Sequence, residues 1–237
     1  MFAALGHVVM KPFMLAWLYT SPHSWRGLPT PEPGPPVLVD GPHLQRVLLC
    51  GSGIVVGYGV TSHELGLGGS LARSLAVLTG CGVEVSTIAG PRLSAKSAQS
   101  QLSAEVLADM DAVVLSFGTF DVLTFRPAKS WGSSMSELVD SVLANAPKDV
   151  HVFVVDCTTP VMARFTAGYR RHLARMTNAY NEEIRALTQQ RERVHQIHFA
   201  PEPEEPDAID GRQSYRSWAD SLAPGIAERL RDSHSGN

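Results

Sequence analysis

Apolar runs alternate with segments of helical periodicity from residue 46 to near the C-terminus. Each run is short and is bounded by glycine or polar residues, which is typical of a buried β-strand. The predicted strands cover residues 46–50, 83–88, 112–117, 150–155 and 194–199. Apolar residues recur at helical spacing between and after them, which predicts helices over residues 65–78, 97–110, 134–144, 170–190 and 214–231. Ser133 or Ser134 is the expected cap of the third helix, with Glu137 in the capping-box position.

This alternation predicts an α/β domain in which helices cover both faces of a five-stranded parallel sheet, a three-layer α/β/α sandwich. Such a sheet binds ligands at the carboxyl ends of its strands. The segments expected at that edge are residues 51–53, 89–90, 118–121 and 156–160, together with the region around Asp210. The 237 residues are enough for one well-buried core of this kind.

The N-terminal residues have a different pattern. Residues 1–19 are mostly apolar, but Lys11-Pro12 interrupts them, so they fall short of a membrane-spanning helix. We expect a helix within residues 1–27 that either docks on the domain or lies in a membrane plane, with Trp17 and Tyr19 at the interface. The rest of the chain is expected to divide into a stiff Pro-rich linker, the domain and a tail, at residues 28–44, 45–232 and 233–237.

Composition narrows the classes of function. Apolar residues make up 44% of the chain, charged residues 18%, and the net charge is -3, which indicates a globular protein and disfavours nucleic-acid binding. Cys50, Cys81 and Cys157 are too few for a disulfide framework, and no His or Cys spacing suits a metal. No cofactor is predicted. Residues 1–27 show no clear signal peptide, so we expect a cytoplasmic protein or one at the inner face of the membrane.

The candidate chemistry lies in glycine-containing blocks that follow the predicted strands. The first block is Gly51-Ser52-Gly53-Ile54-Val55-Val56-Gly57-Tyr58-Gly59-Val60, the second is Gly90, and the third is Gly118-Thr119-Phe120-Asp121. The last is Asp210-Gly211-Arg212-Gln213, followed by Tyr215-x-x-Trp218-Ala219. The lysine of a phosphate-binding P-loop is absent. In this order the blocks resemble those of the SGNH (GDSL-type) hydrolases, in particular a bacterial branch with an apolar N-terminal helix and a Pro-rich linker.

The resemblance implies the flavodoxin-like fold of these esterases and lipases, and it assigns a role to each block. The nucleophilic serine of the family falls at Gly53, and Ser52 occupies the aspartate position before it. Gly90 matches the glycine whose backbone N–H contributes to the oxyanion hole, whereas Phe120 replaces the asparagine that supplies a further donor. Asp210 matches the orienting aspartate, but no histidine stands near Gln213, where the family has its base.

These losses lead to two hypotheses. Acyl transfer through serine needs a hydroxyl beside a base that a carboxylate orients, and Gly53 and Gln213 supply neither group. We therefore expect an impaired member whose Gly53 and Gly90 amides, beside Phe120, bind a small acyl-, ester- or carboxylate-type ligand, or a member that binds a protein partner. The alternative is an active esterase or acyltransferase with Ser52 as a relocated nucleophile and Asp210 as its carboxylate.

The remaining candidates receive structural interpretations. His63 is expected to be a solvated loop residue near the pocket mouth, and Asp121 to hold its loop in shape. His195 and His198 are expected to be packing or edge residues of the last strand. Asp156 and Cys157 end the fourth strand, but a cysteine nucleophile needs a histidine neighbour that the sequence does not identify.

Overall fold

A computed structural model describes residues 27–159, 167–199 and 211–235, with the side chains of residues 214–231 in the last range. Of the first 26 residues, only positions 12, 16 and 20 are described. The expected N-terminal helix, Asp210 and the side chain of Gln213 therefore lie outside the described residues. Within these ranges, no helix combines the length and the apolar character that crossing a bilayer requires.

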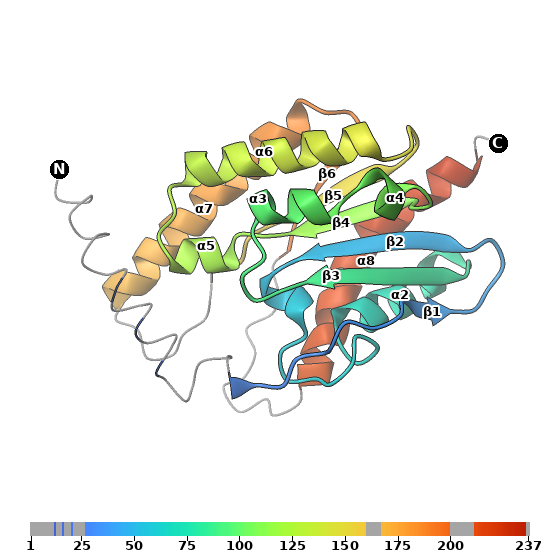
Figure 1. Cartoon of the computed structure of the whole chain (residues 1–237), viewed down its shortest axis with the longest axis horizontal. Helices are drawn as coiled ribbons and strands as arrows, with labels where there is room; N and C mark the ends of the chain where they lie inside the picture. Colours follow the sequence, from blue (N-terminus) through green and yellow to red (C-terminus); the bar gives the residue numbers. More distant parts are fainter. Residues whose placement is uncertain are drawn as a thin grey trace.

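A six-stranded sheet forms the middle layer, in the order β1-β3-β2-β4-β5-β6. The strands from β2 onward are parallel, and β2 and β3 point to the left in Figure 1. They confirm the predicted parallel sheet and are β2 (Gln45–Gly51), β3 (Val83–Ala89), β4 (Ala112–Ser116), β5 (His151–Val155) and β6 (Val194–Ile197).

The sixth strand, β1 (Val37–Val39), pairs antiparallel with β3 at the edge of the sheet. Val37 and Val39 pack against the core, whereas Leu38 between them is 54% exposed. The C-terminal part of the segment expected to be a linker therefore belongs to the sheet. Three residues are too few for an alternating pattern to stand out from a Pro-rich background.

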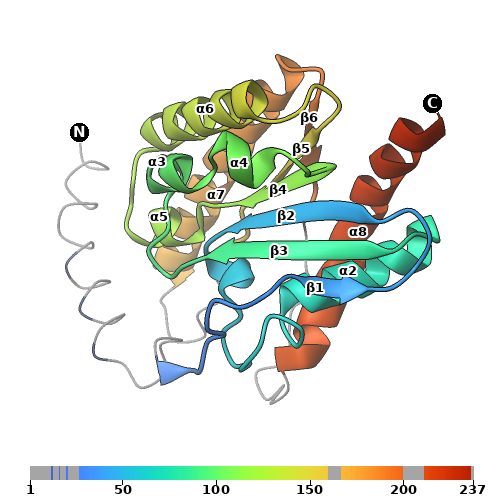
Figure 2. The ribbon, with the colours of Figure 1, turned by 45° about the vertical axis from the view of Figure 1, so that its right-hand side comes forward.

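Helices cover both faces of this sheet (Figures 1 and 2). Because successive strand residues point to opposite faces, Leu48 and Leu115 face the layer that contains α6 (Ala128–Asn145) and α7 (Ala167–Gln189). Their neighbours Val47 and Val114 face α2 (Leu67–Thr79) and α8 (Gly211–Ser235) instead. The predicted three-layer sandwich is confirmed, and it leaves the carboxyl edge of the sheet to its connecting loops.

Two predicted helices have different bounds. The helix expected over residues 97–110 consists of α3 (Ala95–Ala98), a 3₁₀ turn (Gln99–Gln101) and α4 (Ala104–Leu107). Ser94 and Ser103 each accept a bond from a backbone N–H three residues later, so the side chains start separate turns.

The helix α6 begins after Pro127, earlier than the expected cap. The hydroxyls of Ser133 and Ser134 bond back to the carbonyls of Lys129 and Ser130 inside the helix. The capping-box interpretation is wrong, because a serine in mid-helix can satisfy its hydroxyl on the preceding turn.

Candidate functional site

The glycine blocks meet where β2, β3 and β4 end. Gly51 lies between Ala89 of β3 and Ser116 of β4 in the sheet register. The Gly90 N–H donates to the Gly51 carbonyl at 3.3 Å, and the Ser52 N–H donates to the Ser116 carbonyl at 3.0 Å. The predicted convergence of the blocks around Gly53, Gly90 and Gly118 at one edge is therefore confirmed, while Asp210 lies outside the described residues.

Gly53 begins a 3₁₀ turn (Gly53–Val56) with a φ of 63°. A Cβ placed on Gly53 would lie 3.2 Å from Thr119 Oγ1 and 3.4 Å from Thr119 Cβ. The space that a side chain at Gly53 would enter therefore adjoins a threonine hydroxyl, for which we find no hydrogen bond in the described part of the chain. Sequence reasoning missed Thr119, because its neighbour Phe120 stands at the position compared with the family asparagine.

Ser52 is almost fully buried, with 3% of its surface exposed. Its backbone is extended, with φ -126° and ψ -172°, and its hydroxyl does not cap the turn that follows. A nucleophile must meet its electrophile, and a residue with so little exposed surface is poorly placed to do so in this conformation.

The backbone amides of Gly53 and Gly90, which are expected to bind a ligand, differ in their hydrogen bonding. The Gly90 N–H already donates to the Gly51 carbonyl, although the 3.3 Å separation makes this a long bond. A ligand oxygen would therefore compete with Gly51 for the Gly90 amide. The Gly53 amide starts the 3₁₀ turn, where a first N–H has no intrahelical partner.

The third block forms a short helix, α5 (Thr119–Leu123), that the sequence did not reveal. It starts at Gly118, whose φ is 117°, and a Cβ there would run into Cys157 Sγ, with Trp131 and Tyr180 close behind. The absence of a side chain at Gly118 thus lets α5 pack directly over the end of β5. Phe120 is half-buried against the same core cluster.

Asp121 is held within this block by Arg126. The Asp121 carboxylate lies 3.3 Å from the guanidinium, which also donates to Ser134 Oγ at 2.7 Å. The Tyr180 hydroxyl donates to the Arg126 carbonyl at 2.8 Å. Burial raises the pKa of Asp121, and Arg126 opposes that rise. These contacts agree with the structural role expected for Asp121.

Cys50 and Cys157 are buried thiols that stay protonated near neutral pH. Cys157 is buried and its thiol donates to the Phe117 carbonyl at 3.1 Å. Burial raises its pKa far above the usual range, and burial also raises the pKa of Cys50 to about 12. Neither sulfur is available as a thiolate near neutral pH.

Asp156 and His198 form a pair that sequence reasoning did not find. The carboxylate of Asp156 lies 3.0 Å from His198 Nδ1 and accepts the Gln196 amide at 2.6 Å. The sheet register explains this pair, because Val155 pairs with Ile197 and so brings Asp156 next to His198. The His198 side chain is 78% exposed.

This pair does not complete a triad with the glycine blocks. It lies at the ends of β5 and β6, and β4 and β5 separate β6 from β2. Three strand spacings amount to about 14 Å, which is beyond the reach of an imidazole for a proton at Gly53 or Ser52.

The other histidines lie elsewhere. His195 Nε2 is 2.9 Å from His151 Nδ1, and the His195 ring packs against Phe153, one strand away in the register. Burial, together with the His151 charge, lowers the pKa of His195 to about 4. His63 lines a hollow with the Pro-rich segment, and burial lowers its pKa. Among the residues with described side chains, no three His, Cys, Asp or Glu gather as they would around a metal ion.

Comparison with known proteins identifies the family of the chain and structures that share its fold. A model of the GDSL-like Lipase/Acylhydrolase family matches residues 49–226, which is more than half of the chain. A search of curated proteins finds no match.

Several solved structures share the fold. An active-site mutant of a family two carbohydrate esterase from Clostridium thermocellum has a TM-score of 0.61 and 14% identity, over 84% of this chain and 65% of that one. This chain thus spans less than two thirds of that enzyme. The lipase Lip_vut3 from a goat rumen metagenome has a TM-score of 0.58 and 12% identity, over 80% and 97%. The inhibitor-bound aryl esterase of M. smegmatis has a TM-score of 0.53 and 21% identity, over 78% and 99%.

Proposed function

Since the chain belongs to the GDSL-like lipase/acylhydrolase family, we propose that it is a non-hydrolytic member that binds an acyl-, ester- or carboxylate-type ligand. The observation that carries this proposal is the lack of an accessible nucleophile at the end of β2. Gly53 has no side chain, and the adjacent Ser52 is a buried residue with 3% of its surface exposed. Function depends on the site and not on the fold that holds it.

The Thr119 hydroxyl is the nearest substitute for the missing serine, but a general base for it is lacking among the described contacts. The Asp156–His198 pair lies at the far end of the sheet, and Asp121 is engaged by Arg126. An alcohol without a base at hydrogen-bond distance is a poor nucleophile at neutral pH. Thr119 is better suited to donate a hydrogen bond to a ligand oxygen.

The geometry of this edge suits binding. Gly53 leaves room beside the Thr119 hydroxyl, the backbone amides of Gly53 and Gly90 lie nearby, and Phe120 contributes an apolar surface. A carbonyl or carboxylate oxygen held by a few placed donors, with an apolar group beside it, is the arrangement that small-molecule sites use.

An ester-hydrolysis assay tests the proposal. The wild-type protein should cleave p-nitrophenyl acetate and butyrate at the rate of buffer, because losing nucleophile and base costs about 10⁶-fold in turnover. Ser52→Ala and Thr119→Val should leave that rate unchanged. Wild-type turnover that Ser52→Ala abolishes would establish the alternative, an active enzyme with a relocated nucleophile. An active esterase of the same family serves as the positive control.

Residues 1–19 also remain a candidate for peripheral membrane contact, on the strength of their apolar sequence with Trp17 and Tyr19. Removing residues 1–26 and comparing sedimentation with anionic lipid vesicles tests this part of the proposal. We expect the full chain to sediment with the vesicles and the shortened chain to stay in solution. Equal sedimentation of both chains would exclude a membrane role for this segment.

A further inference from the structure

Three arginines are clustered near the start of α7, in the layer that contains α6 and α7. They are Arg170, Arg171 and Arg175, and all three are exposed. We propose that this α7 cationic surface (Arg170, Arg171 and Arg175) binds the anionic headgroups of a lipid membrane. The inference rests on the proposed function in one respect, namely that residues 1–19 provide an apolar contact with the same membrane.

The first half of α7 carries positive charge without acidic residues to balance it. No acid stands in its first turn, and none stands three or four residues before or after any of the three arginines. Arg171 and Arg175 are four residues apart, so they place like charges on one side of the helix. The α7 cationic surface is therefore strongly positive, although the whole chain has a net charge of -3.

The guanidinium groups of this surface have no partner within the described part of the chain. No hydrogen bond or ion pair joins Arg170, Arg171 or Arg175 to another described residue. The helix dipole also opposes cations near the N-terminus of a helix. Folding alone gives no reason for this arrangement, whereas an external anionic surface would neutralise it.

The segment that packs against the start of α7 does not supply a free carboxylate. Phe125, which follows α5, contacts the rings of Tyr169 and His172, with centroids 5.8 and 5.6 Å away. The acidic residue of α5 is Asp121, and Arg126 pairs with it at 3.3 Å. This neighbouring carboxylate is thus already neutralised by another cation.

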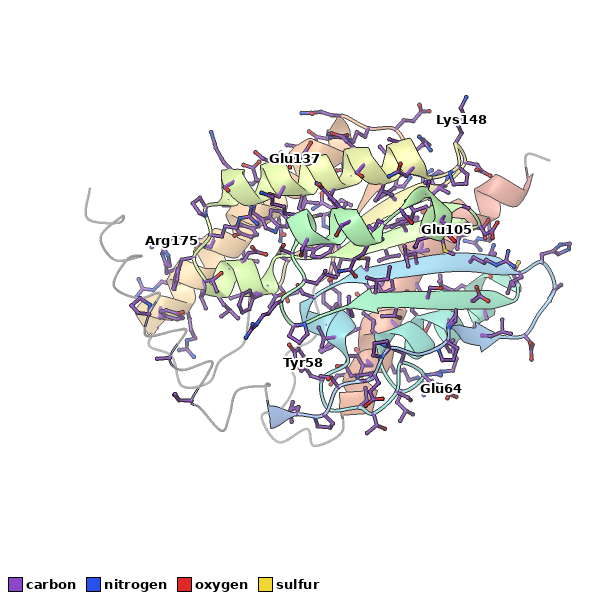
Figure 3. The ribbon with its side chains drawn as sticks, viewed as in Figure 1. Tyr58, Glu64, Glu105, Glu137, Lys148 and Arg175 are labelled. Atoms are coloured by element: carbon purple, nitrogen blue, oxygen red, sulfur yellow. The ribbon has the colours of Figure 1, made fainter. Side chains whose placement is uncertain are left out.

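Cations elsewhere in this layer have acidic neighbours in the sequence. In the second half of α7, Arg185 stands three residues after Glu182, and Lys148 beyond the end of α6 is followed by Asp149. Figure 3 shows Arg175 toward the end of the layer at which α7 begins and Lys148 at the opposite end. Positive charge without acidic neighbours is therefore concentrated at one end of α7.

A membrane suits this surface better than a nucleic acid does. The three arginines are spread along the helix, so they face many headgroups side by side, and each cation near an anionic bilayer strengthens binding. Stable attachment of a protein to a membrane takes two signals, and the apolar residues 1–19 are the other signal in this chain. The net charge of -3 disfavours binding along a nucleic acid.

Sedimentation of the full chain with lipid vesicles tests the inference. Vesicles that mix phosphatidylcholine with phosphatidylserine are compared with vesicles of phosphatidylcholine alone. The wild-type chain should bind the anionic vesicles more tightly, and added salt should weaken this binding. A triple variant should lose about 100-fold in partition onto the anionic vesicles, as expected for the removal of three cations from a membrane surface. Its changes are Arg170→Gln, Arg171→Gln and Arg175→Gln.

Two further triple variants separate the local charge from the net charge. The first removes the same total charge from exposed positions elsewhere and should change partition by less than about threefold. Its changes are Lys148→Gln, Arg185→Gln and Arg216→Gln. The second keeps the charge of the α7 cationic surface and should keep most of the binding, through Arg170→Lys, Arg171→Lys and Arg175→Lys. All three variants should melt at the temperature of the wild type, because the altered residues are exposed.

The remaining outcomes separate this inference from the proposed function. Equal partition of the wild type and the arginine-to-glutamine variant would overturn the inference, as would an equal loss in the variant with scattered changes. Sedimentation that is lost without residues 1–26 but kept in the arginine-to-glutamine variant would leave the role of residues 1–19 standing and overturn that of α7. Binding of a short DNA duplex in place of vesicles would also overturn the inference. Ester hydrolysis by the wild-type protein would overturn the non-hydrolytic function alone.

Discussion

The two ends of the carboxyl edge differ in what they contain. At the ends of β2, β3 and β4, Gly53, Gly90 and Gly118 follow the last paired strand residues, but Gly53 has no side chain and Ser52 is buried. At β5 and β6, the Asp156–His198 pair has the chemistry of an acid–base dyad, but β6 lies three strand spacings, about 14 Å, from β2. The difference teaches that a set of glycine turns and an oriented histidine do not make a catalytic site when they stand apart. The base must lie within hydrogen-bond distance of the nucleophile.

The largest effect should come from the scaffold end. Gly118→Ala should lower the free energy of unfolding by about 2–4 kcal/mol, because φ is 117° and the new Cβ meets Cys157 Sγ. Gly59→Ala is the matched control: its φ is 84°, but a Cβ would meet nothing within 4 Å, so the cost should be about 1 kcal/mol. Urea denaturation measures both. An equal loss of unfolding free energy in the two variants would mean that close packing at Gly118 does not stabilise the fold.

Restoring the hydroxyl at the nucleophile position sharpens the comparison. Gly53→Ser should cost about 1–2 kcal/mol, since φ is 63° and the side chain would press on Thr119 at 3.2 Å. It should produce no esterase activity, because the Asp156–His198 pair cannot reach the new serine. A serine hydrolase rate in this variant would show that a base does reach Gly53.

His195 on β6 provides the pH dependence. The pKa of His195 is lowered by burial to about 4, against 6.5 in the unfolded chain, so the unfolded state binds more protons between these values. Stability should therefore fall as pH drops from about 6.5 toward 4, by about 1 kcal/mol once solvent screening is allowed for. Urea denaturation at pH 7 and pH 4.5 should show a smaller loss in His195→Gln than in the wild type. His198→Gln, one residue beyond the end of β6, is the matched control, and an equal reduction there would contradict the assignment to His195.

The smallest effect should come from the dyad itself. The His198 side chain is 78% exposed, so His198→Ala should change the free energy of unfolding by less than about 0.5 kcal/mol. Ligand binding at the Gly53 end should also be unchanged. A clear loss of binding in His198→Ala would join the two regions into one site and break the comparison.

Local signals in the sequence predicted most of the fold. Apolar runs and glycine turns located the five parallel strands and their common edge, because burial on both faces leaves a continuous apolar pattern. Residues 97–110 did not form one helix, since Ser94 and Ser103 cap separate turns, and the three residues of β1 carry no period. Thr119 and the Asp156–His198 pair depend on which segments lie next to each other across the sheet. That information resides in long-range register and not in any single stretch of sequence.

Labelling of the intact protein with a fluorophosphonate probe, read by mass spectrometry, tests the central claim most directly. The probe reports an activated serine regardless of substrate. We predict that the wild-type protein stays unlabelled under conditions in which an active esterase of the family is fully modified. Stoichiometric labelling of the wild type, abolished by Ser52→Ala, would contradict the account and show that the catalytic hydroxyl has moved by one residue.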